Sequence, residues 1–115
     1  MPEEGLREPT FFILTALAGG RLHGYGVIQS VLGLSEGRVK LRPGTVYGTL
    51  DRLETDGLVA ADGEEIVSGR ARRYFRLTGL GQEALAAETD RLAANVRVAK
   101  RALVRLGGRP AGRLA

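Results

Sequence analysis

The chain has 115 residues with 43% apolar side chains, 17 Lys or Arg against 13 Asp or Glu, one His and no Cys, giving a net charge of +4. This length predicts one domain with a small core, and a second copy of the chain would help to bury more surface. The absence of Cys excludes disulfides, thiolate zinc sites and a Cys nucleophile, and a single His argues against His-based metal and acid–base sites. The longest apolar run, residues 11–18, is too short for a membrane span and lacks signal-peptide flanks, so we expect a cytoplasmic protein.

Two helices are expected in the first third of the chain. Thr10 is suited to cap the first one, which runs to the two glycines at residues 19–20. The second covers about residues 23–32, where apolar side chains recur at helical spacing, and Gly33 is its expected stop.

A third helix is the best-bounded element of the sequence. Pro43 suits its first position because the proline ring presets the helical φ. Val46, Leu50 and Leu53 then form one apolar stripe along the helix. Gly57 follows as a residue that ends a helix in the left-handed conformation.

Two strands follow the third helix. Residues 58–66 and 71–77 are expected to pair as a hairpin with its tip at 67–70, and Phe75 and Leu77 should face the core. The side chains that this alternation points outward are Arg72, Tyr74 and Arg76.

A long last helix, capped by Thr78, carries apolar residues at the 4–3 spacing typical of a helix that packs along a partner helix. The predicted dimerisation residues are Leu85, Leu92, Val96, Ala99, Leu103 and Leu106. Gly79 and Gly81 are expected to weaken its first turn by about 1 kcal/mol each relative to Ala. Residues 91–115 hold seven basic and no acidic side chains, so most of the positive charge lies on the solvent side of this helix and in the tail after it.

The order of elements predicts a mainly α fold with a small β-hairpin: a winged helix-turn-helix followed by one long C-terminal helix. We expect the winged helix-turn-helix domain to cover residues 1–77, the dimerisation helix 78–107 and a disordered tail 108–115.

The third helix is the candidate element for reading DNA. Several side chains on its solvent-exposed face are small, which would let the helix axis approach a groove closely. The same face offers hydroxyl groups and a guanidinium group to phosphates or base edges. The residues expected there are Gly44, Thr45, Gly48, Asp51 and Arg52, flanked by Tyr47 and Thr49. Arg42 stands beside the helix N-terminus, which is a natural phosphate site. The same composition also suits an ordinary solvated helix face.

The hairpin concentrates positive charge. Arg70, Arg72, Arg73 and Arg76 lie within seven residues, with Tyr74 among them and no acid. Such a group can follow a sugar–phosphate backbone or reach into a minor groove. The alternative is an edge strand that uses charge to block aggregation.

We expect no enzyme, cofactor or metal site. No nucleophile–base pair can be built from the serines, and the glycines do not have a phosphate-binding spacing. His23 has no second ligand nearby and is expected to be structural.

Three motifs resemble the PadR-type transcriptional regulators. Residues 22–25 read LHGY, residues 41–59 read LRPGTVYGTLDRLETDGLV and residues 69–78 read GRARRYFRLT, in the order and spacing of that family. The resemblance implies a cytosolic bacterial repressor that binds double-stranded operator DNA as a homodimer, with residues 43–45 and Tyr47 at the start of the recognition helix and residues 72–74 on the wing.

The chain also departs from the family pattern. Arg42 stands where the family often has a Ser cap, and no aromatic residue follows Phe75, although some relatives stack flat drugs on a Trp of the last helix. Phe11, Phe12 and Tyr25 remain as candidates for a pocket that takes a small hydrophobic or phenolic effector. Two other functions stay open: a protein–protein interaction module that does not bind DNA, and a small RNA-binding winged helix.

Overall fold

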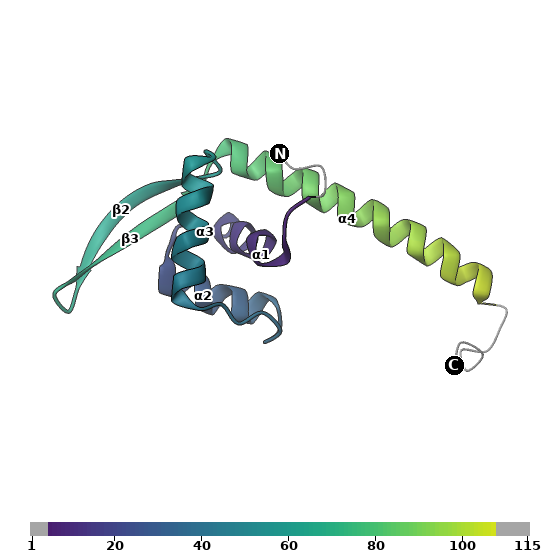
Figure 1. The fold of residues 1–115 in the computed structure, drawn as a ribbon, viewed down its shortest axis with the longest axis horizontal. Helices are drawn as coiled ribbons and strands as arrows, with labels where there is room; N and C mark the ends of the chain where they lie inside the picture. Colours follow the sequence, from purple (N-terminus) through teal and green to yellow (C-terminus); the bar gives the residue numbers. More distant parts are fainter. Residues whose placement is uncertain (1–4, 108–115) are drawn as a thin grey trace.

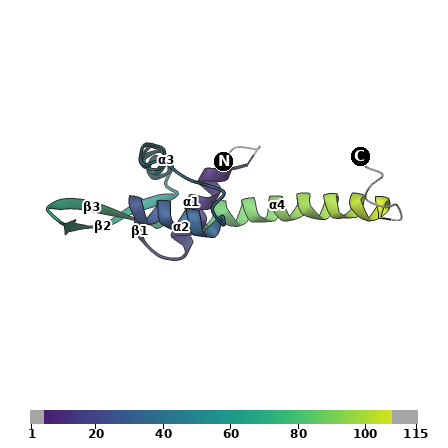
Figure 2. The ribbon, with the colours of Figure 1, turned by 90° about the horizontal axis from the view of Figure 1, so that it is seen from below.

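A computed structural model describes residues 5–107 of the chain (Figure 1). Over these residues the elements are α1 (Glu8–Ala18), β1 (Leu22–His23), α2 (Gly24–Leu34), α3 (Pro43–Thr55), β2 (Val59–Val67), β3 (Arg70–Leu77) and α4 (Gly79–Leu106). Helices α1 to α3 form the body, the β2–β3 hairpin projects from one end and α4 extends from the other (Figures 1 and 2), over 62 × 27 × 20 Å. The predicted winged helix-turn-helix with a long last helix is confirmed.

The core lies where the three helices of the body meet the base of the sheet. Its fully buried side chains come from every element of the body and from both long strands: Ile13, Leu14, Val27, Val31, Val46, Leu50, Val59 and Phe75. The predicted stripe of α3 is confirmed, because Val46, Leu50 and Leu53 are all buried.

Helix α3 begins and ends as its sequence predicts. Pro43 occupies the first turn, and Gly57 has a φ of 78° just beyond the last one. The Leu58 N–H donates to the Leu53 carbonyl at 2.9 Å, and the Gly57 N–H donates to the Glu54 carbonyl at 3.0 Å. These two hydrogen bonds are the pair that closes a helix C-terminus around a left-handed glycine.

The ends of α1 and α2 differ from the prediction. Helix α1 begins at Glu8, so Thr10 lies inside the helix, where it is buried and is not the cap; Pro9 instead occupies the first turn. Helix α2 continues through Gly33 to Leu34, since the left-handed backbone that reverses the chain is at residues 36–37. A glycine in a helix costs only about 1 kcal/mol, and tertiary packing can outweigh that cost.

A short third strand was missed by the sequence analysis. Strand β1 pairs antiparallel with β3 at Phe75 and Tyr74, so the sheet has the order β1–β3–β2. The hairpin tip is confirmed at residues 67–70, where Ser68 and Gly69 both have positive φ, as a two-residue turn of type I′ requires. A register shift between Ala61 and Glu64 interrupts the β2–β3 pairing.

The first turn of α4 is closely packed against the end of α3. The Thr78 hydroxyl accepts a hydrogen bond from the Gly81 N–H at 3.0 Å, which confirms the predicted cap, and donates to the Gly57 carbonyl at 2.6 Å. A Cβ on Gly81 would lie 2.0 Å from the Leu58 carbonyl oxygen, whereas one on Gly79 would meet open space. The expectation that Ala would be preferred at residue 81 is therefore wrong, because the backbone of residue 58 needs that space.

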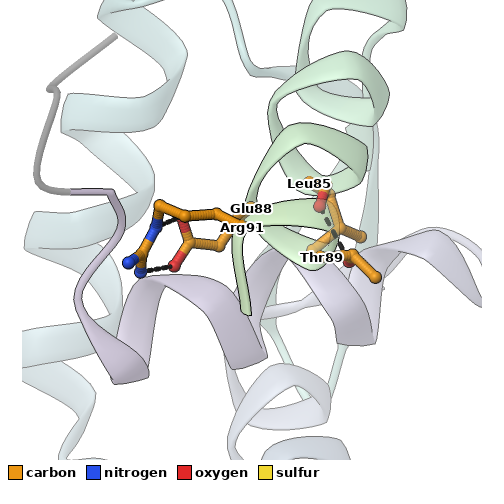
Figure 3. Close-up of polar contacts among 4 residues, drawn as sticks. All are labelled: Leu85, Glu88, Thr89 and Arg91. Atoms are coloured by element: carbon orange, nitrogen blue, oxygen red, sulfur yellow. Dashed lines mark hydrogen bonds and ion pairs between the residues drawn. The ribbon is translucent and has the colours of Figure 1, made fainter. Parts of the chain in front are cut away.

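An ion pair between two residues of α4, of which only the glutamate is buried, packs against the segment before α1. Glu88 is 5% exposed and accepts two hydrogen bonds from the guanidinium of Arg91, one of them 3.0 Å from Nε (Figure 3). A Cβ on Gly5 would lie within 2.6 Å of both side chains, so this segment packs directly on the pair. Thr89, on the same helix, donates to the Leu85 carbonyl at 2.9 Å (Figure 3).

The charge state of Glu88 makes stability depend on pH. The Arg91 guanidinium, helped by the Leu6 N–H, holds the pKa of Glu88 below its ordinary value although burial acts to raise it. Stability from a carboxylate with a lowered folded-state pKa is present above its unfolded-state pKa of about 4.3 and is lost as the pH falls through the folded-state pKa. We expect Glu88→Gln to be less stable than the wild type at pH 7, with the difference shrinking below about pH 4.

Urea unfolding of both proteins from pH 7 to pH 2 measures this difference. Glu83→Gln, an exposed glutamate of the same helix, is the matched control and should follow the wild type at every pH. Parallel pH profiles for the wild type and Glu88→Gln would contradict the role given to the ion pair.

Candidate nucleic-acid interface

One face of α3 is open to solvent, and we call it the reading face. Its residues are Gly44, Thr45, Tyr47, Gly48, Asp51 and Arg52, all of which are exposed, as the sequence predicts. Thr49 is not part of it, since that side chain is only 6% exposed. Thr49 follows Val46 by three residues and precedes Leu53 by four, which places it on the apolar stripe.

The N-terminus of α3 has no side-chain cap. Arg42 occupies the cap position and makes no capping hydrogen bond, so α3 lacks the cap that a Ser could supply there. The Val46 N–H is bonded to the Arg42 carbonyl at 3.0 Å, while the amide groups of Gly44 and Thr45 precede the first intrahelical bond. Unbonded N–H groups, the helix dipole and an adjacent guanidinium together favour an anion at this end.

Tyr47 is held in place by a glycine at the start of α2. A Cβ on Gly24 would lie 2.5 Å from the ring carbon Cζ of Tyr47, so the phenol rests directly on the glycine backbone. Tyr47 still exposes 49% of its surface on the reading face. The contact explains the glycine of the LHGY motif, and the sequence analysis missed it because the two residues are far apart in the chain.

All four wing arginines are exposed, and the guanidinium groups of Arg70, Arg72 and Arg76 lie outside the ion pairs within residues 5–107. Arg70 stands at the turn and Arg72 lies along β3. Arg72 Nη1 is 3.5 Å from His23 Nε2, while His23 Nδ1 accepts the Gly26 N–H at 3.2 Å. A neutral His that accepts at Nδ1 carries its proton on Nε2, so the contact with Arg72 is not a hydrogen bond in that tautomer. The Arg72 guanidinium is therefore available to an anion.

Tyr74 is more enclosed than its outward position predicts. It is half-buried, its ring packs edge-on against His23 with 5.2 Å between centroids, and its hydroxyl donates to Glu65 at 3.4 Å. Arg21 lies over the same ring at 4.2 Å and donates to the Asp62 carbonyl at 2.8 Å. No local sequence signal points to Arg21, since its partners lie 41 and more residues away in the chain.

Acidic residues face the wing arginines across the sheet. Glu64 pairs with Arg73 and Glu65 with Arg72 in the β2–β3 register, a juxtaposition that only the folded hairpin reveals. Arg73 also approaches α3, where its guanidinium is 3.6 Å from Glu54. The wing is therefore less strongly positive than the segment 70–76 alone indicates.

The predicted effector residues are not gathered into one pocket. Phe11 packs edge-on against Phe12 with 5.6 Å between centroids, whereas Tyr25 is 61% exposed and stacks on His23. A cleft of about 1160 Å³ lies instead between the N-terminal segment and the facing parts of α3 and α4, and none of these three residues lines it.

Within residues 5–107 there is no group of three or more His, Cys, Asp or Glu side chains that could hold a metal ion. No helix in that range is long and apolar enough to cross a membrane.

The predicted dimerisation residues follow α4 away from the body. Leu85 packs against the core, Leu92 and Leu106 are partly exposed, and Ala99 is exposed. Val96 and Leu103 expose 50% and 59% of their surface. The predicted tail at 108–115 lies outside the described residues.

Comparison with known proteins identifies the family. The sequence profile of the transcriptional regulator PadR-like family matches residues 13–87. Transcriptional regulator Rv3488 of Mycobacterium tuberculosis is 42% identical over 73 residues, which are 64% of this chain and 64% of that protein. The match thus spans slightly less than two thirds of the mycobacterial relative.

Solved structures share the fold. A PadR family transcription regulator from Clostridium difficile R20291 superposes with a TM-score of 0.69 at 23% identity, covering 84% of this chain and 99% of that one. Bacillus subtilis PadR in complex with operator DNA gives a TM-score of 0.62 at 21% identity, covering 70% and 46%. With the profile match over most of the chain, these findings show that the chain belongs to the PadR-like family of transcriptional regulators.

Proposed function

We propose that this chain represses transcription by binding pseudo-palindromic operator DNA as a homodimer. The observation that carries the proposal is the combination of two positive features around α3. The uncapped N-terminus of α3 with Arg42 opens onto the exposed reading face. The wing, which contacts the last turn of α3 through Arg73 and Glu54, carries the exposed guanidinium groups of Arg70 and Arg72. An α-helix fits the major groove, and guanidinium groups on a wing suit the adjacent phosphates.

Each contact has a proposed role. Arg42, Gly44 and Thr45 bind phosphate at the helix N-terminus, since backbone N–H groups and a cation converge there. Arg52 and the Thr45 hydroxyl are the candidates for base edges. The structure of Bacillus subtilis PadR with operator DNA supports this proposal through the shared fold.

The homodimer is proposed from the exposed apolar side chains of α4. Val96, Leu103 and Val104 expose half or more of their surface on a helix that extends away from the body (Figure 1). A two-fold axis through such a helix pair would present two reading faces to half-sites about one helical turn apart. A protein that binds bacterial operator DNA acts in the cytoplasm.

Release by a small hydrophobic or phenolic effector is part of the same proposal. Tyr25 offers an exposed ring, and Phe11 and Phe12 lie partly exposed on α1. An effector bound between copies of the chain would change the spacing of the two reading faces and thereby the fit to DNA.

A gel shift with the promoter region of the protein's own gene tests the function directly. The protein should retard this duplex at concentrations at which an unrelated duplex of equal length stays free. Excess RNA of the same sequence should compete poorly, because few aromatic side chains are placed to stack on bases. Equal retardation of both duplexes, or preferential competition by RNA, would contradict operator binding.

Two substitutions on α3 separate reading from simple attraction to phosphate. We expect Thr45→Ala and Arg52→Ala to change which base pairs are preferred, with about 1–3 kcal/mol of discrimination lost at the contacted position. Selection from a randomised duplex library, followed by sequencing, measures the preference of each variant. If both variants select the wild-type sequences, α3 is not the reading element.

A second candidate function is a protein–protein interaction module that keeps the fold without binding DNA. Three acidic residues, Asp51, Glu54 and Asp56, lie on or beside the reading face and would repel phosphate. The gel shift separates the two candidates, since a module of this kind would retard no duplex.

A further inference from the structure

Arg73 differs from the other arginines of the wing in what its guanidinium contacts. Its Nη2 is 3.6 Å from Glu54 Oε1 on α3, and its guanidinium carbon lies 5.0 Å from the centroid of the Phe75 ring. Side chains two residues apart on a strand share one face, and Phe75 is buried in the core. Arg73 therefore lies on the face of β3 that turns toward α3.

The ion pair joins the end of the reading helix to the wing. Glu54 is in the last turn of α3, and Arg73 is four residues before the end of β3. The wing projects well beyond the body (Figures 1 and 2), so a small rotation at its base displaces the tip by a much larger distance. A contact at this position is well placed to hold the angle between the two elements that are to meet one stretch of DNA.

We propose that Arg73 is a positioning residue, which holds the wing at the angle to α3 that DNA binding requires through its pairing with Glu54 and its packing on Phe75. The proposal rests on the proposed operator binding. It gives Arg73 an indirect role in place of the phosphate contact expected from the sequence.

The two roles of Arg73 predict opposite effects of removing Glu54. If Arg73 only contacts phosphate, loss of the carboxylate removes a negative charge close to DNA and strengthens binding. If Arg73 positions the wing, loss of the carboxylate releases the guanidinium and weakens binding.

Fluorescence anisotropy with an operator duplex at several salt concentrations measures these effects. Glu54→Ala and Arg73→Ala should each weaken binding by about fivefold, as expected for a partly exposed ion pair reinforced by an aromatic face. The double Ala variant should bind DNA no more weakly than either single variant. The charge-swapped pair, Glu54→Arg with Arg73→Glu, should restore the affinity to within about twofold of the wild type. Arg73→Ala should keep the wild-type dependence on salt.

Glu64→Ala is the matched control. Glu64 is exposed and pairs with Arg73 across the strands, yet the ion pair that Arg73 makes is with Glu54. Glu64→Ala changes the net charge by the same amount as Glu54→Ala and should leave the affinity for the operator duplex unchanged or higher. Tighter binding by Glu54→Ala, or a salt slope reduced by about one unit in Arg73→Ala, would show that Arg73 contacts phosphate and would overturn the proposal.

A measurement without DNA separates this proposal from operator binding. The chain has no Cys, so spin labels can be placed at Gln29→Cys on α2 and Ser68→Cys at the wing tip without other changes. The labelled chain is diluted with an excess of the unlabelled protein, so that only the distance within one copy contributes. Pulsed dipolar spectroscopy should then give one narrow distance distribution, broadened by Glu54→Ala or Arg73→Ala and narrowed again by the charge swap. An unchanged distribution in both variants would overturn the proposal even if the wild type binds its operator. Broadening would support it even if no operator is bound.

Discussion

Replacing Gly81 by Ala is expected to lower the free energy of unfolding by roughly 3 kcal/mol, because an added methyl group has no space at this position. The new Cβ would lie 2.0 Å from the Leu58 carbonyl oxygen and 2.7 Å from Leu77 Cδ1. Leu77 can rotate away, but the Leu58 carbonyl is backbone and accepts the Thr78 N–H at 3.1 Å. The junction between α3, the sheet and α4 would have to open.

Gly79→Ala is the matched control, since a Cβ there meets open space two residues earlier in the same helix. It should leave stability unchanged or raise it by up to about 1 kcal/mol, as the helix propensity of Ala predicts. Urea unfolding followed by circular dichroism measures both variants. Equal stability of the two would contradict the packing described for this junction.

Removing Arg70 and Arg72 together is expected to cause the largest loss of DNA affinity. Each exposed guanidinium that neutralises a phosphate contributes about 0.9 to the slope of log K against log salt, so the double Ala variant should lose about 1.8 units. Charge-assisted hydrogen bonds contribute about 1.5–3 kcal/mol each, so affinity at moderate salt should fall by roughly a hundredfold or more.

The control for this pair removes the same charge elsewhere. Arg97 and Lys100 are exposed on α4 and lie off the predicted dimerisation residues. Their replacement by Ala should change the salt slope far less than the loss of Arg70 and Arg72. If both double variants have the same slope, the wing makes no specific phosphate contact.

Elements whose ends are marked by characteristic residues in the sequence were predicted well. Helix α3 is bounded by Pro43 and Gly57, and the hairpin tip is marked by the Ser68–Gly69 pair. Both signals act within a few residues, so they are visible without knowledge of the fold. The predicted division into residues 1–77 and 78–107 stays a prediction.

The errors arose where distant parts of the chain meet. Strand β1 has only two residues and forms because β3 lies alongside it about 50 residues later. Gly81 is required by the carbonyl of Leu58, and the guanidinium of Arg73 is directed by Glu54. Thr49 was wrongly predicted to flank the reading face for a different reason. A threonine at the edge of an apolar stripe can face either the core or solvent, and its neighbours in the sequence do not decide between the two.

The net charge became useful evidence on DNA binding only once the charged residues were located along the chain and in the fold. The net charge of +4 comes mainly from residues 91–115, and the described part of this segment, 91–107, follows α4 away from the body (Figure 1). What supports DNA binding is the combination of an uncapped N-terminus on the reading helix with a wing whose Arg70, Arg72 and Arg76 are exposed and lie outside the ion pairs of the described residues.

Selection of bound fragments from the genome that encodes this protein tests the central claim most directly. The wild type should enrich a small set of fragments that share an inverted repeat with half-sites about 10 base pairs apart, as expected for a dimer with two recognition helices. The variant without Arg70 and Arg72 should enrich none of them. Failure of the wild type to enrich any shared sequence, or equal enrichment by the variant, would contradict operator recognition by α3 and the wing.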